Sequence, residues 1–288
     1  MAVIIQLIVA SAAIGFVYAL VALGINLIWS CVSAVNFAQG GLTMLGAYIL
    51  VTYYAILHVN LLLSMVLTLI TMAAIGVIFG RLVYWPLREK SQINFLIAAI
   101  GTSILLVEFA NRAWGNFPWS VPSLFPNLST FGSIVVDSQY ILICVVAMIF
   151  LAAQSYFVKK TYYGKMLRAT ALDKQTAALV GINTSLMITG TFAYSTLLAG
   201  LAGSFVAPLY FVTPALSAVL LKGFAAAIIG GFGKVEGAVY GGLLVGFAET
   251  FGSFYISSSY RDAWAFLVLI GFLLFRPQGF FGREEVAI

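Results

Sequence analysis

Two pairs of polar side chains interrupt the long apolar stretches of this sequence, and the first pair consists of amides. Asn36 and Gln39 lie three residues apart, and each side chain offers two N–H donors and one carbonyl acceptor. If the stretch is helical, the two amides share one face. In a cavity they could bind a zwitterion or an amide, and in a helical bundle they could instead satisfy backbone groups of a neighbouring helix. The sequence leaves both roles open.

The second pair joins a carboxylate to a lysine. Glu249 lies inside the apolar stretch 238–253, and Lys222 and Lys234 precede it. A carboxylate within a membrane-spanning segment is costly and points to a function or to a firm partner. In one interpretation, a Lys–Glu ion pair fixes the packing of the helices. In the other, the carboxylate lies on the substrate pathway or at a gate. Both interpretations stay open.

The composition shows why these few polar groups matter. Of the 288 residues, 62% are hydrophobic and only 8% are charged, against about 25% in ordinary soluble domains. The mean hydropathy is +1.08. A soluble domain of this kind would expose large apolar patches. The composition therefore excludes a soluble enzyme, a nucleic-acid-binding domain and a disordered tail, and it indicates an integral membrane protein.

Charge-free stretches define the membrane segments. Whole blocks are apolar without the alternation of a barrel strand, which predicts helices. We predict an all-α, polytopic transmembrane bundle of about eight or nine segments, some broken or half-spanning, in one domain over residues 1–288. The predicted segments are 4–27, 42–57, 61–80, 93–110, 140–158, 185–207, 218–229, 238–253 and 264–275.

Glycines break two of these segments, near 36–41 and near 230–237. Paired broken helices in the two halves of a membrane protein point to a translocation pathway. An inverted repeat would fit this pattern, although the two halves share no evident sequence identity. Glycines also recur four residues apart, a spacing that predicts close helix packing, at the pairs Gly76/Gly80, Gly237/Gly241 and Gly242/Gly246.

Lysines and arginines predict the orientation of the bundle. They gather at 81–90, at 159–174 and after the last segment at Arg276 and Arg283, whereas 111–137 holds only Arg112. The positive-inside rule places the first three regions in the cytoplasm. The net charge of +5 then reflects this topology and contact with anionic lipid rather than nucleic acid.

Motifs for catalysis and for metal binding are missing from the sequence. Cys31 and Cys144 lie in apolar stretches without CxxC spacing, so we interpret them as small buried hydrophobic residues. The stretch 230–235 does not match the phosphate-binding pattern GxxxxGK[ST]. If ATP drives this protein, another chain must hydrolyse it.

The basic loop 159–183 is the most informative segment outside the membrane. Alanine and leucine favour one helix over 165–180, and Gly181 is suited to end it. Ala169, Leu172, Thr176 and Leu179 would then share a face. Such a helix could lie on the bilayer or dock into a groove of a cytoplasmic partner.

This loop resembles the coupling loop of LivH-type permeases, the membrane subunits of branched-chain amino acid ABC importers. Three further regions resemble that family in the same order along the chain: 35–48, the Gly-rich turn at 230–242, and the spacing of Pro277, Gly279 and Gly282. The residues that carry the resemblance in the loop are Gly164, Arg168, Ala169, Asp173, Ala177 and Gly181.

The resemblance implies a permease subunit of an ATP-driven importer of branched-chain or hydrophobic amino acids, in the inner membrane of a bacterium. It implies no enzyme activity and no cofactor in this chain. The implied partners are a second, LivM-like permease subunit in a heterodimer, two cytoplasmic ATPases that bind ATP and Mg, an extracytoplasmic substrate-binding protein, and membrane lipid. By analogy, the six loop residues form the ATPase-coupling element, while Asn36, Phe37, Gln39, Gly40 and Gly41, together with Glu249, are the candidates for the substrate pathway.

This chain departs from the family pattern at two positions. The family often has His at the position of Gln39 and Pro at the position of Glu236. Related permeases carry urea, short amides or other amino acids, so these substrates remain alternatives. Two other classes also remain: a secondary transporter or channel that works alone, and a purely structural membrane partner.

Overall fold

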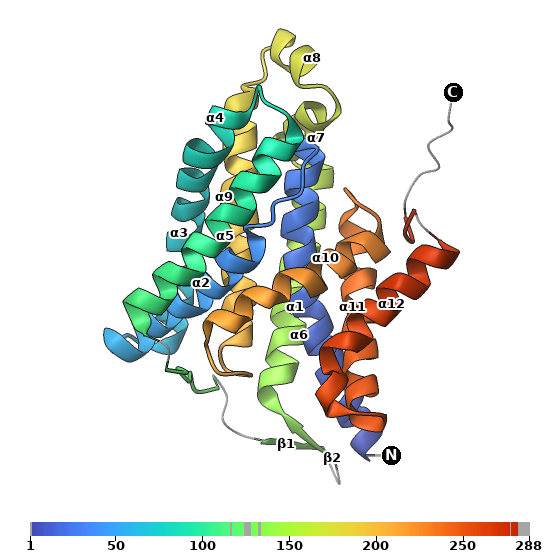
Figure 1. Ribbon diagram of the computed structural model, residues 1–288. Helices are drawn as coiled ribbons and strands as arrows, with labels where there is room; N and C mark the ends of the chain where they lie inside the picture. Colours follow the sequence, from blue (N-terminus) through green and yellow to red (C-terminus); the bar gives the residue numbers. More distant parts are fainter. Residues whose placement is uncertain (1, 116, 124–127, 132–133, 277, 282–288) are drawn as a thin grey trace.

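Long helices run side by side through the molecule (Figure 1). The computed structural model describes residues 2–115, 117–123, 128–131, 134–276 and 278–281. Pro277, Gly282 and Arg283, which belong to the C-terminal patterns noted above, lie outside these residues. In the first half, the helices are α1 (Ala2–Val32), α2 (Gln39–Val51), α3 (Leu61–Phe79), α4 (Trp85–Leu87), α5 (Gln92–Trp114) and α6 (Ser138–Lys160). In the second half, they are α7 (Tyr162–Leu172), α8 (Lys174–Leu179), α9 (Thr184–Val206), α10 (Val219–Gly230), α11 (Val235–Tyr255) and α12 (Arg261–Phe275).

Shorter elements join these helices. Single π-helical turns follow α2 and α3, at η1 (Thr52–Ile56) and η2 (Gly80–Tyr84), and 3-10 turns precede α10 and α12, at η3 (Pro214–Ala218) and η4 (Ser258–Tyr260). A small antiparallel hairpin of β1 (Leu128–Phe131) and β2 (Ile134–Asp137) precedes α6.

Among the described residues, 6 helical stretches are long and apolar enough to cross a membrane: Val3–Val32, Leu61–Leu87, Gln92–Trp114, Ser138–Lys160, Thr184–Val206 and Ser258–Phe275. The segments α2, α10 and α11 accompany them. The predicted polytopic helical bundle with half-spanning segments is therefore confirmed. The β1–β2 hairpin is a small addition to it, and it lies in the segment expected outside the cell.

One segment runs further than predicted. The crossing expected at 61–80 continues through η2 and α4 to Leu87. Pro86 lies one residue before its end, so the helix stops within one turn of the proline.

The halves of the chain are built as inverted counterparts, which the sequence left open. In each half a long helix (α1 or α9) is followed by a break, a half-length helix (α2 or α10) and a third helix (α3 or α11). Helices α1 and α9 are antiparallel, since Cys31 contacts Thr191 while Gly24 contacts Ser195. Each packs mainly against the third helix of the other half, α1 on α11 and α9 on α3. Both predicted breaks are present, at 33–38 and at 231–234. The counterpart of 33–38 in the second half is, however, 207–213, so the two predicted breaks do not correspond to each other.

Glycine allows these helices to approach closely, as the four-residue spacings predicted. A Cβ at Gly76 would come within 2.6 Å of the carbonyl oxygen of Phe192 on α9. A Cβ at Gly242 would come within 2.6 Å of the carbonyl oxygen of Gly15 on α1. Backbone atoms cannot move aside as a flexible side chain can, so these positions admit glycine alone without a shift of helices.

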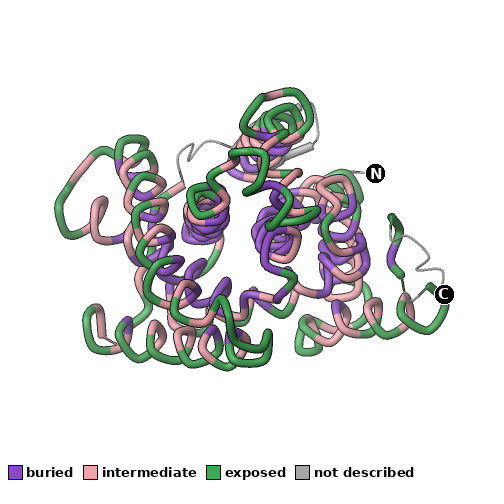
Figure 2. Tube along the Cα trace, turned by 90° about the horizontal axis from the view of Figure 1, so that it is seen from above, coloured by how far each residue is buried: buried purple, intermediate pink, exposed green. Residues whose placement is uncertain are grey.

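Burial and charge mark the faces and the ends of the bundle. Seen from above, buried residues fill the centre and exposed residues face outward (Figure 2). The outward residues of α3, α5 and α12 include large apolar side chains such as Leu62, Ile104 and Leu274, which suits contact with acyl chains. The basic regions at α4 and at α7–α8 lie at one end, and the β1–β2 hairpin lies at the other (Figure 1). This arrangement agrees with the predicted orientation.

Candidate functional site

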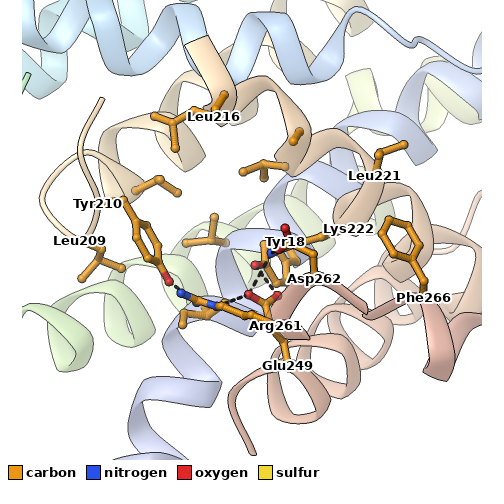
Figure 3. Close-up of a pocket in the computed structure, with 16 residues that line it drawn as sticks. Tyr18, Leu209, Tyr210, Leu216, Leu221, Lys222, Glu249, Arg261, Asp262 and Phe266 are labelled. Carbon is orange, nitrogen blue, oxygen red and sulfur yellow. Dashed lines mark hydrogen bonds and ion pairs between the residues drawn. The ribbon is translucent and has the colours of Figure 1, made fainter. Parts of the chain in front are cut away.

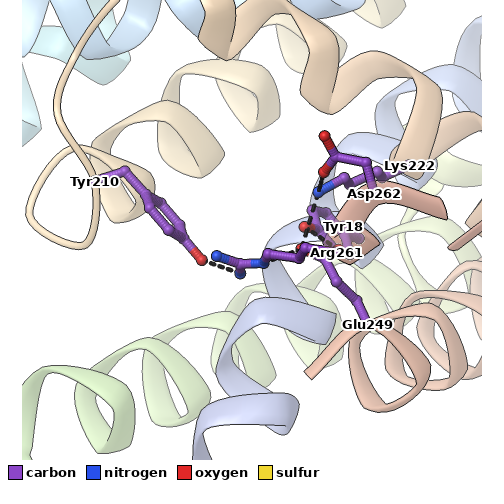
Figure 4. Close-up of polar contacts among 6 residues, drawn as sticks. All are labelled: Tyr18, Tyr210, Lys222, Glu249, Arg261 and Asp262. Carbon is purple, nitrogen blue, oxygen red and sulfur yellow. Dashed lines mark hydrogen bonds and ion pairs between the residues drawn. The ribbon is translucent and has the colours of Figure 1, made fainter. Parts of the chain in front are cut away.

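An ion cluster on α1, α10, α11 and α12 surrounds the carboxylate of Glu249 (Figure 4). Oε1 of Glu249 accepts a hydrogen bond from Nζ of Lys222 at 2.9 Å and another from Nε of Arg261 at 2.6 Å. Oε2 accepts a hydrogen bond from the hydroxyl of Tyr18 at 2.7 Å. The Glu249 side chain is 0% exposed, so both of its oxygens are buried and satisfied by strong, charge-assisted hydrogen bonds.

A second carboxylate and a second tyrosine extend the ion cluster. Asp262 lies with Oδ1 2.7 Å from Nζ of Lys222. Nη2 of Arg261 donates to the hydroxyl of Tyr210, and the guanidinium lies 5.0 Å from the centre of the Tyr210 ring. Two cations therefore face two carboxylates, and their formal charges sum to zero. Neutrality is what makes four charges tolerable among apolar helices.

The ion cluster forms one wall of a cavity of about 270 Å³ (Figure 3). The rest of the lining is largely apolar and comes from α1, from the stretch 206–216 and from α12, and it includes Leu209, Leu216 and Phe266. Lys222 and Arg261 are partly exposed, at 14% and 32%, and Asp262 is 78% exposed. The cavity therefore offers both charged groups and apolar surface.

Sequence reasoning found one pair in this cluster and missed the rest. Lys222 was one of the two predicted partners of Glu249 and is confirmed, while Lys234 is not a partner and its carbonyl instead accepts from Asn26 at 3.1 Å. Arg261 and Asp262 were missed because adjacent opposite charges at the start of a helix resemble an ordinary surface end. The Tyr18 hydroxyl carries no signal within an apolar run.

The first predicted group, 36–41, occupies the break between α1 and α2. Asn36 is not helical: its Oδ1 accepts from the backbone N–H of Ala38 at 3.1 Å, which forms a local turn. The condition for a shared helical face is therefore not met, and the predicted break near these residues is present. Asparagine favours such turns at a helix start. Nδ2 of Asn36 is buried without a partner among the described residues.

Gln39 begins α2 and is bound from two sides. Its Nε2 donates to the carbonyl of Ser195 on α9 at 3.1 Å, and its Oε1 accepts from the Ser195 hydroxyl at 3.1 Å. The same hydroxyl lies 2.9 Å from the carbonyl of Gly24 on α1. In this conformation the amide of Gln39 ties α2 to α9 and α1, which is the structural role of the two considered.

The half-helix α10 lies between the two predicted groups. The ring of Phe224 lies 5.6 Å from the ring of Phe37, and Leu220, one turn earlier, meets Gly40. Lys222 is two residues from each of these, which turns it about 200° around the helix and toward the ion cluster. One face of α10 thus contacts the start of α2, and the opposite face completes the charged site. Gly41 lies on the other side of α2, where a Cβ would come within 3.1 Å of the Ser103 hydroxyl.

At the basic end, two helices replace the single helix expected over 165–180. Asp173 breaks the run: its backbone is extended, and its side chain caps α8 by accepting from the backbone N–H of Gln175 at 2.8 Å and of Thr176 at 3.2 Å. Residues 169–179 therefore do not form one continuous face. Aspartate at a helix start competes with helix continuation, which the alanine-rich composition hid. The predicted end at Gly181 is confirmed, with φ of +85°.

The loop is tied to the bundle at its start and exposed at its outer end. Gly164 packs where a Cβ would meet backbone of 157–158, and Nη2 of Arg168 donates to the carbonyl of Lys159 at 3.3 Å. Ala169 is half-buried and Ala177 is buried. Leu172 and Leu179, by contrast, are each 88% exposed. The two helices of the loop therefore each present an exposed leucine beside basic residues.

The contacts of the loop reach the start of α11. Nζ of Lys159 donates to Glu236, which lies on the first turn of α11. Just before α11, the carbonyl of Lys234 accepts a hydrogen bond from the side-chain amide of Asn26 on α1. The loop thus contacts the same helix that carries Glu249 at its other end.

Groups of three or more His, Cys, Asp or Glu side chains that could hold a metal ion are absent from the described residues. Cys31 and Cys144 are free thiols.

Comparisons with known proteins agree over the whole length of the chain. Residues 7–275 match the family described as branched-chain amino acid transport system / permease component. The high-affinity branched-chain amino acid transport system permease protein BraD of Pseudomonas aeruginosa is 33% identical, over 95% of this chain and 94% of the relative. The corresponding protein LivH of Escherichia coli is 32% identical with the same coverage. The probable LivH permease protein of Methanocaldococcus jannaschii is 25% identical over 92% of this chain and 88% of the relative.

A solved structure shares the fold at low sequence similarity. The structure described as PsaBC from Streptococcus pneumoniae in complex with Fab has a TM-score of 0.50 and 14% identity, and it covers 94% of this chain and 89% of that chain. At this identity the likeness concerns the fold alone.

Proposed function

The chain belongs to the family of branched-chain amino acid transport permeases, and we propose that it is the permease subunit of an ATP-driven importer. Its relatives are transport permease proteins, and the chain is accordingly a multi-pass membrane permease and not an enzyme. The proposal adds the energy source, the partners, the substrate and the bacterial inner membrane as its location.

The observation that carries the proposal is the exposure of Leu172 on α7 and of Leu179 on α8, both in the basic loop. Large apolar side chains exposed at the cytoplasmic end favour a partner that covers them. A groove on a cytoplasmic partner would bury them, as apolar helix anchors are buried elsewhere. We assign that groove to two ATPase subunits, which bind ATP and Mg.

The coupling element of this proposal is the loop 159–183. Gly164 permits the tight turn from α6, Asp173 caps α8, and Ala177 packs α8 inward. Arg168 and Ala169 lie on α7, and Gly181 returns the chain to the membrane. Movement of this element reaches α11 through Lys159 and Glu236.

The substrate pathway of this proposal runs beside α10. Phe37 and Gly40 contact one face of α10, Asn36, Gln39 and Gly41 adjoin them in the chain, and Glu249 anchors the opposite face. An extracytoplasmic binding protein delivers a branched-chain or other hydrophobic amino acid at the end with the β1–β2 hairpin. A second, related permease subunit completes the channel as a heterodimer.

Reconstitution tests the proposal. The chain and its partner subunits are placed in proteoliposomes, and uptake of leucine is measured with and without ATP and the binding protein. We expect uptake only with both. In Leu179→Asp the ATPase subunits should no longer co-purify, whereas Lys90→Asp, which adds an acidic residue at the same end, should leave them bound. Uptake by this chain alone, driven by an ion gradient, would instead show a secondary transporter.

The substrate is tested separately on the binding protein. Titration with leucine, other amino acids, urea and short amides is expected to give the tightest binding for hydrophobic amino acids. Preference for urea or an amide would retain the importer and replace the substrate.

A further inference from the structure

The cavity beside the ion cluster has the two-sided character of a site for a small amphiphilic molecule. Its volume of about 270 Å³ lies near the lower bound for ligand pockets, about 300 Å³, which suits a single small molecule rather than a peptide. We propose that this cavity binds the zwitterion of an α-amino acid, with Asp262 holding the ammonium group and Arg261 and Lys222 holding the carboxylate. The assignment rests on the proposed import function and names the residues that would recognise the substrate.

Glu249 holds the site together and is not itself a ligand. Both of its oxygens are occupied by Lys222, Arg261 and Tyr18, and the side chain is 0% exposed. These contacts fix the two cations at the edge of the cavity. A buried carboxylate that organises cations in this way acts as a positioning residue.

Asp262 is the carboxylate that a ligand can reach. It is 78% exposed, and Oδ1 contacts Lys222 while Oδ2 has no partner given among the described residues. Because Asp262 adjoins Arg261 in the sequence and contacts Lys222 in space, an anionic acceptor and two cationic donors lie side by side. An α-amino acid carries its ammonium and carboxylate groups on one carbon, which matches this spacing.

Charge balance selects a zwitterion over other small molecules. The two cations and two carboxylates of the ion cluster already sum to zero. A bound anion or cation would leave a net charge among apolar helices, which is strongly unfavourable, whereas a zwitterion leaves the site neutral. A purely structural role would need only one ion pair, because each further charge adds a desolvation cost. The second cation and the second carboxylate are therefore explained by a ligand that carries both charges.

The apolar wall determines which amino acids fit. Leu209, Leu216 and Phe266 line the cavity around the ion cluster (Figure 3). A branched aliphatic side chain would contact these residues when the charged end lies on Asp262 and Arg261. A polar side chain would lose its hydration without gaining a partner.

The test uses the complete transporter in proteoliposomes and in detergent. Asp262→Asn removes one charge from an exposed residue, so the fold should persist. We expect the KM for leucine uptake to rise about tenfold or more, as for loss of a charge-assisted hydrogen bond. Asp262→Glu should restore much of the uptake, and Glu89→Gln, which removes an exposed carboxylate elsewhere, should behave as wild type.

Thermal unfolding in detergent provides a readout that does not depend on transport. Millimolar leucine should raise the Tm of the wild-type complex. Isopentylamine, which lacks the carboxylate, and 4-methylpentanoate, which lacks the ammonium, should not. An unchanged KM and an unchanged leucine-induced shift in Asp262→Asn would overturn the assignment. Absence of ATP-dependent uptake by the wild-type complex would instead overturn the importer function, so the two failures are distinct.

Discussion

Tyr18 donates a 2.7 Å hydrogen bond to Glu249 across a sequence separation of 231 residues. The contact joins α1 of the first half of the chain to α11 of the second half. Ser195 makes the reciprocal kind of contact, since its hydroxyl on α9 meets Gln39 of α2. Each half therefore supplies a polar group that the other half satisfies. In an inverted pair of halves such contacts specify how the two parts are docked.

Loss of the Tyr18 hydroxyl is expected to weaken this docking. Tyr18→Phe leaves Oε2 of Glu249 buried without its donor, which costs about 1–3 kcal/mol. Thermal unfolding in detergent measures the change. Glu249→Leu should cost more, about 3–5 kcal/mol, because it leaves two cations without their shared carboxylate. The control is Tyr240→Phe, at an exposed tyrosine on α11, the helix of Glu249. An equal loss of stability in this control would refute the special role of the Tyr18 hydroxyl.

Two glycines of α9 should respond in opposite ways to alanine. At Gly203 a Cβ would fall on backbone atoms of Thr43 and Ala47 of α2, while at Gly190 nothing lies within 4 Å. Gly203→Ala should destabilise by about 1–3 kcal/mol through overpacking. Gly190→Ala should be neutral or stabilise by up to about 1 kcal/mol through helix propensity. Equal unfolding temperatures for the two variants would show that α2 and α9 are not in close contact.

A feature of the fold or of the site could be predicted from the sequence when it depends on residues that are close together in the chain. Charge-free runs and glycine spacing act locally, so the membrane segments, the break at 33–38 and the close packing at Gly76 were predictable. Lys222 was predictable as a partner because it lies one short helix away from Glu249. Tyr18 was not, since only the folded arrangement of halves brings it near.

Local competition explains the remaining errors. Asp173 hydrogen-bonds to backbone just ahead of it, so it ends a helix that the neighbouring residues favour. Arg261 and Asp262 failed to stand out for a different reason, because a charged pair next to a predicted span looks like an interfacial end. Their inward orientation depends on α10 and α11, which no local pattern encodes.

A buried amide on α6 provides the third prediction. Gln154 is 1% exposed, and neither its Oε1 nor its Nε2 has a partner among the described residues. Burial of an unpaired amide costs about 1–3 kcal/mol, so Gln154→Leu should raise stability by about that amount. Gln39→Leu is the matched control and should lower stability, because Gln39 bonds to Ser195. Gln154 lines a separate cavity of about 290 Å³, and a loss of stability in Gln154→Leu would indicate that water or a ligand in this cavity bonds to the amide.

The cap of α8 should respond to pH. The pKa of Asp173 is lowered by hydrogen bonds from the Thr176 side chain and from the backbone N–H groups of Thr176 and Gln175. A lowered pKa means that the cap is fully present above the ordinary value of about 4 and is lost as the pH falls through the folded value. Amide exchange of residues 174–181 should therefore accelerate only in strong acid, after correction for intrinsic rates. In Asp173→Ala the acceleration should already be present at neutral pH, and identical exchange in both proteins would refute the cap.

The last prediction concerns the link from the loop to the membrane. Arg168 donates to the carbonyl of Lys159, and the side chain of Lys159 holds Glu236 at the start of α11. Arg168→Glu removes the donor and introduces a carboxylate that competes with Glu236 for the Lys159 side chain. The contact between α7 and the start of α11 should therefore be lost. We expect ATPase activity that no longer rises with the loaded binding protein, together with loss of uptake. Lys165→Glu reverses an exposed charge on the same helix and should keep both activities. Because the ATPases still assemble in either variant, normal stimulation in Arg168→Glu would mean that force reaches α11 by another route.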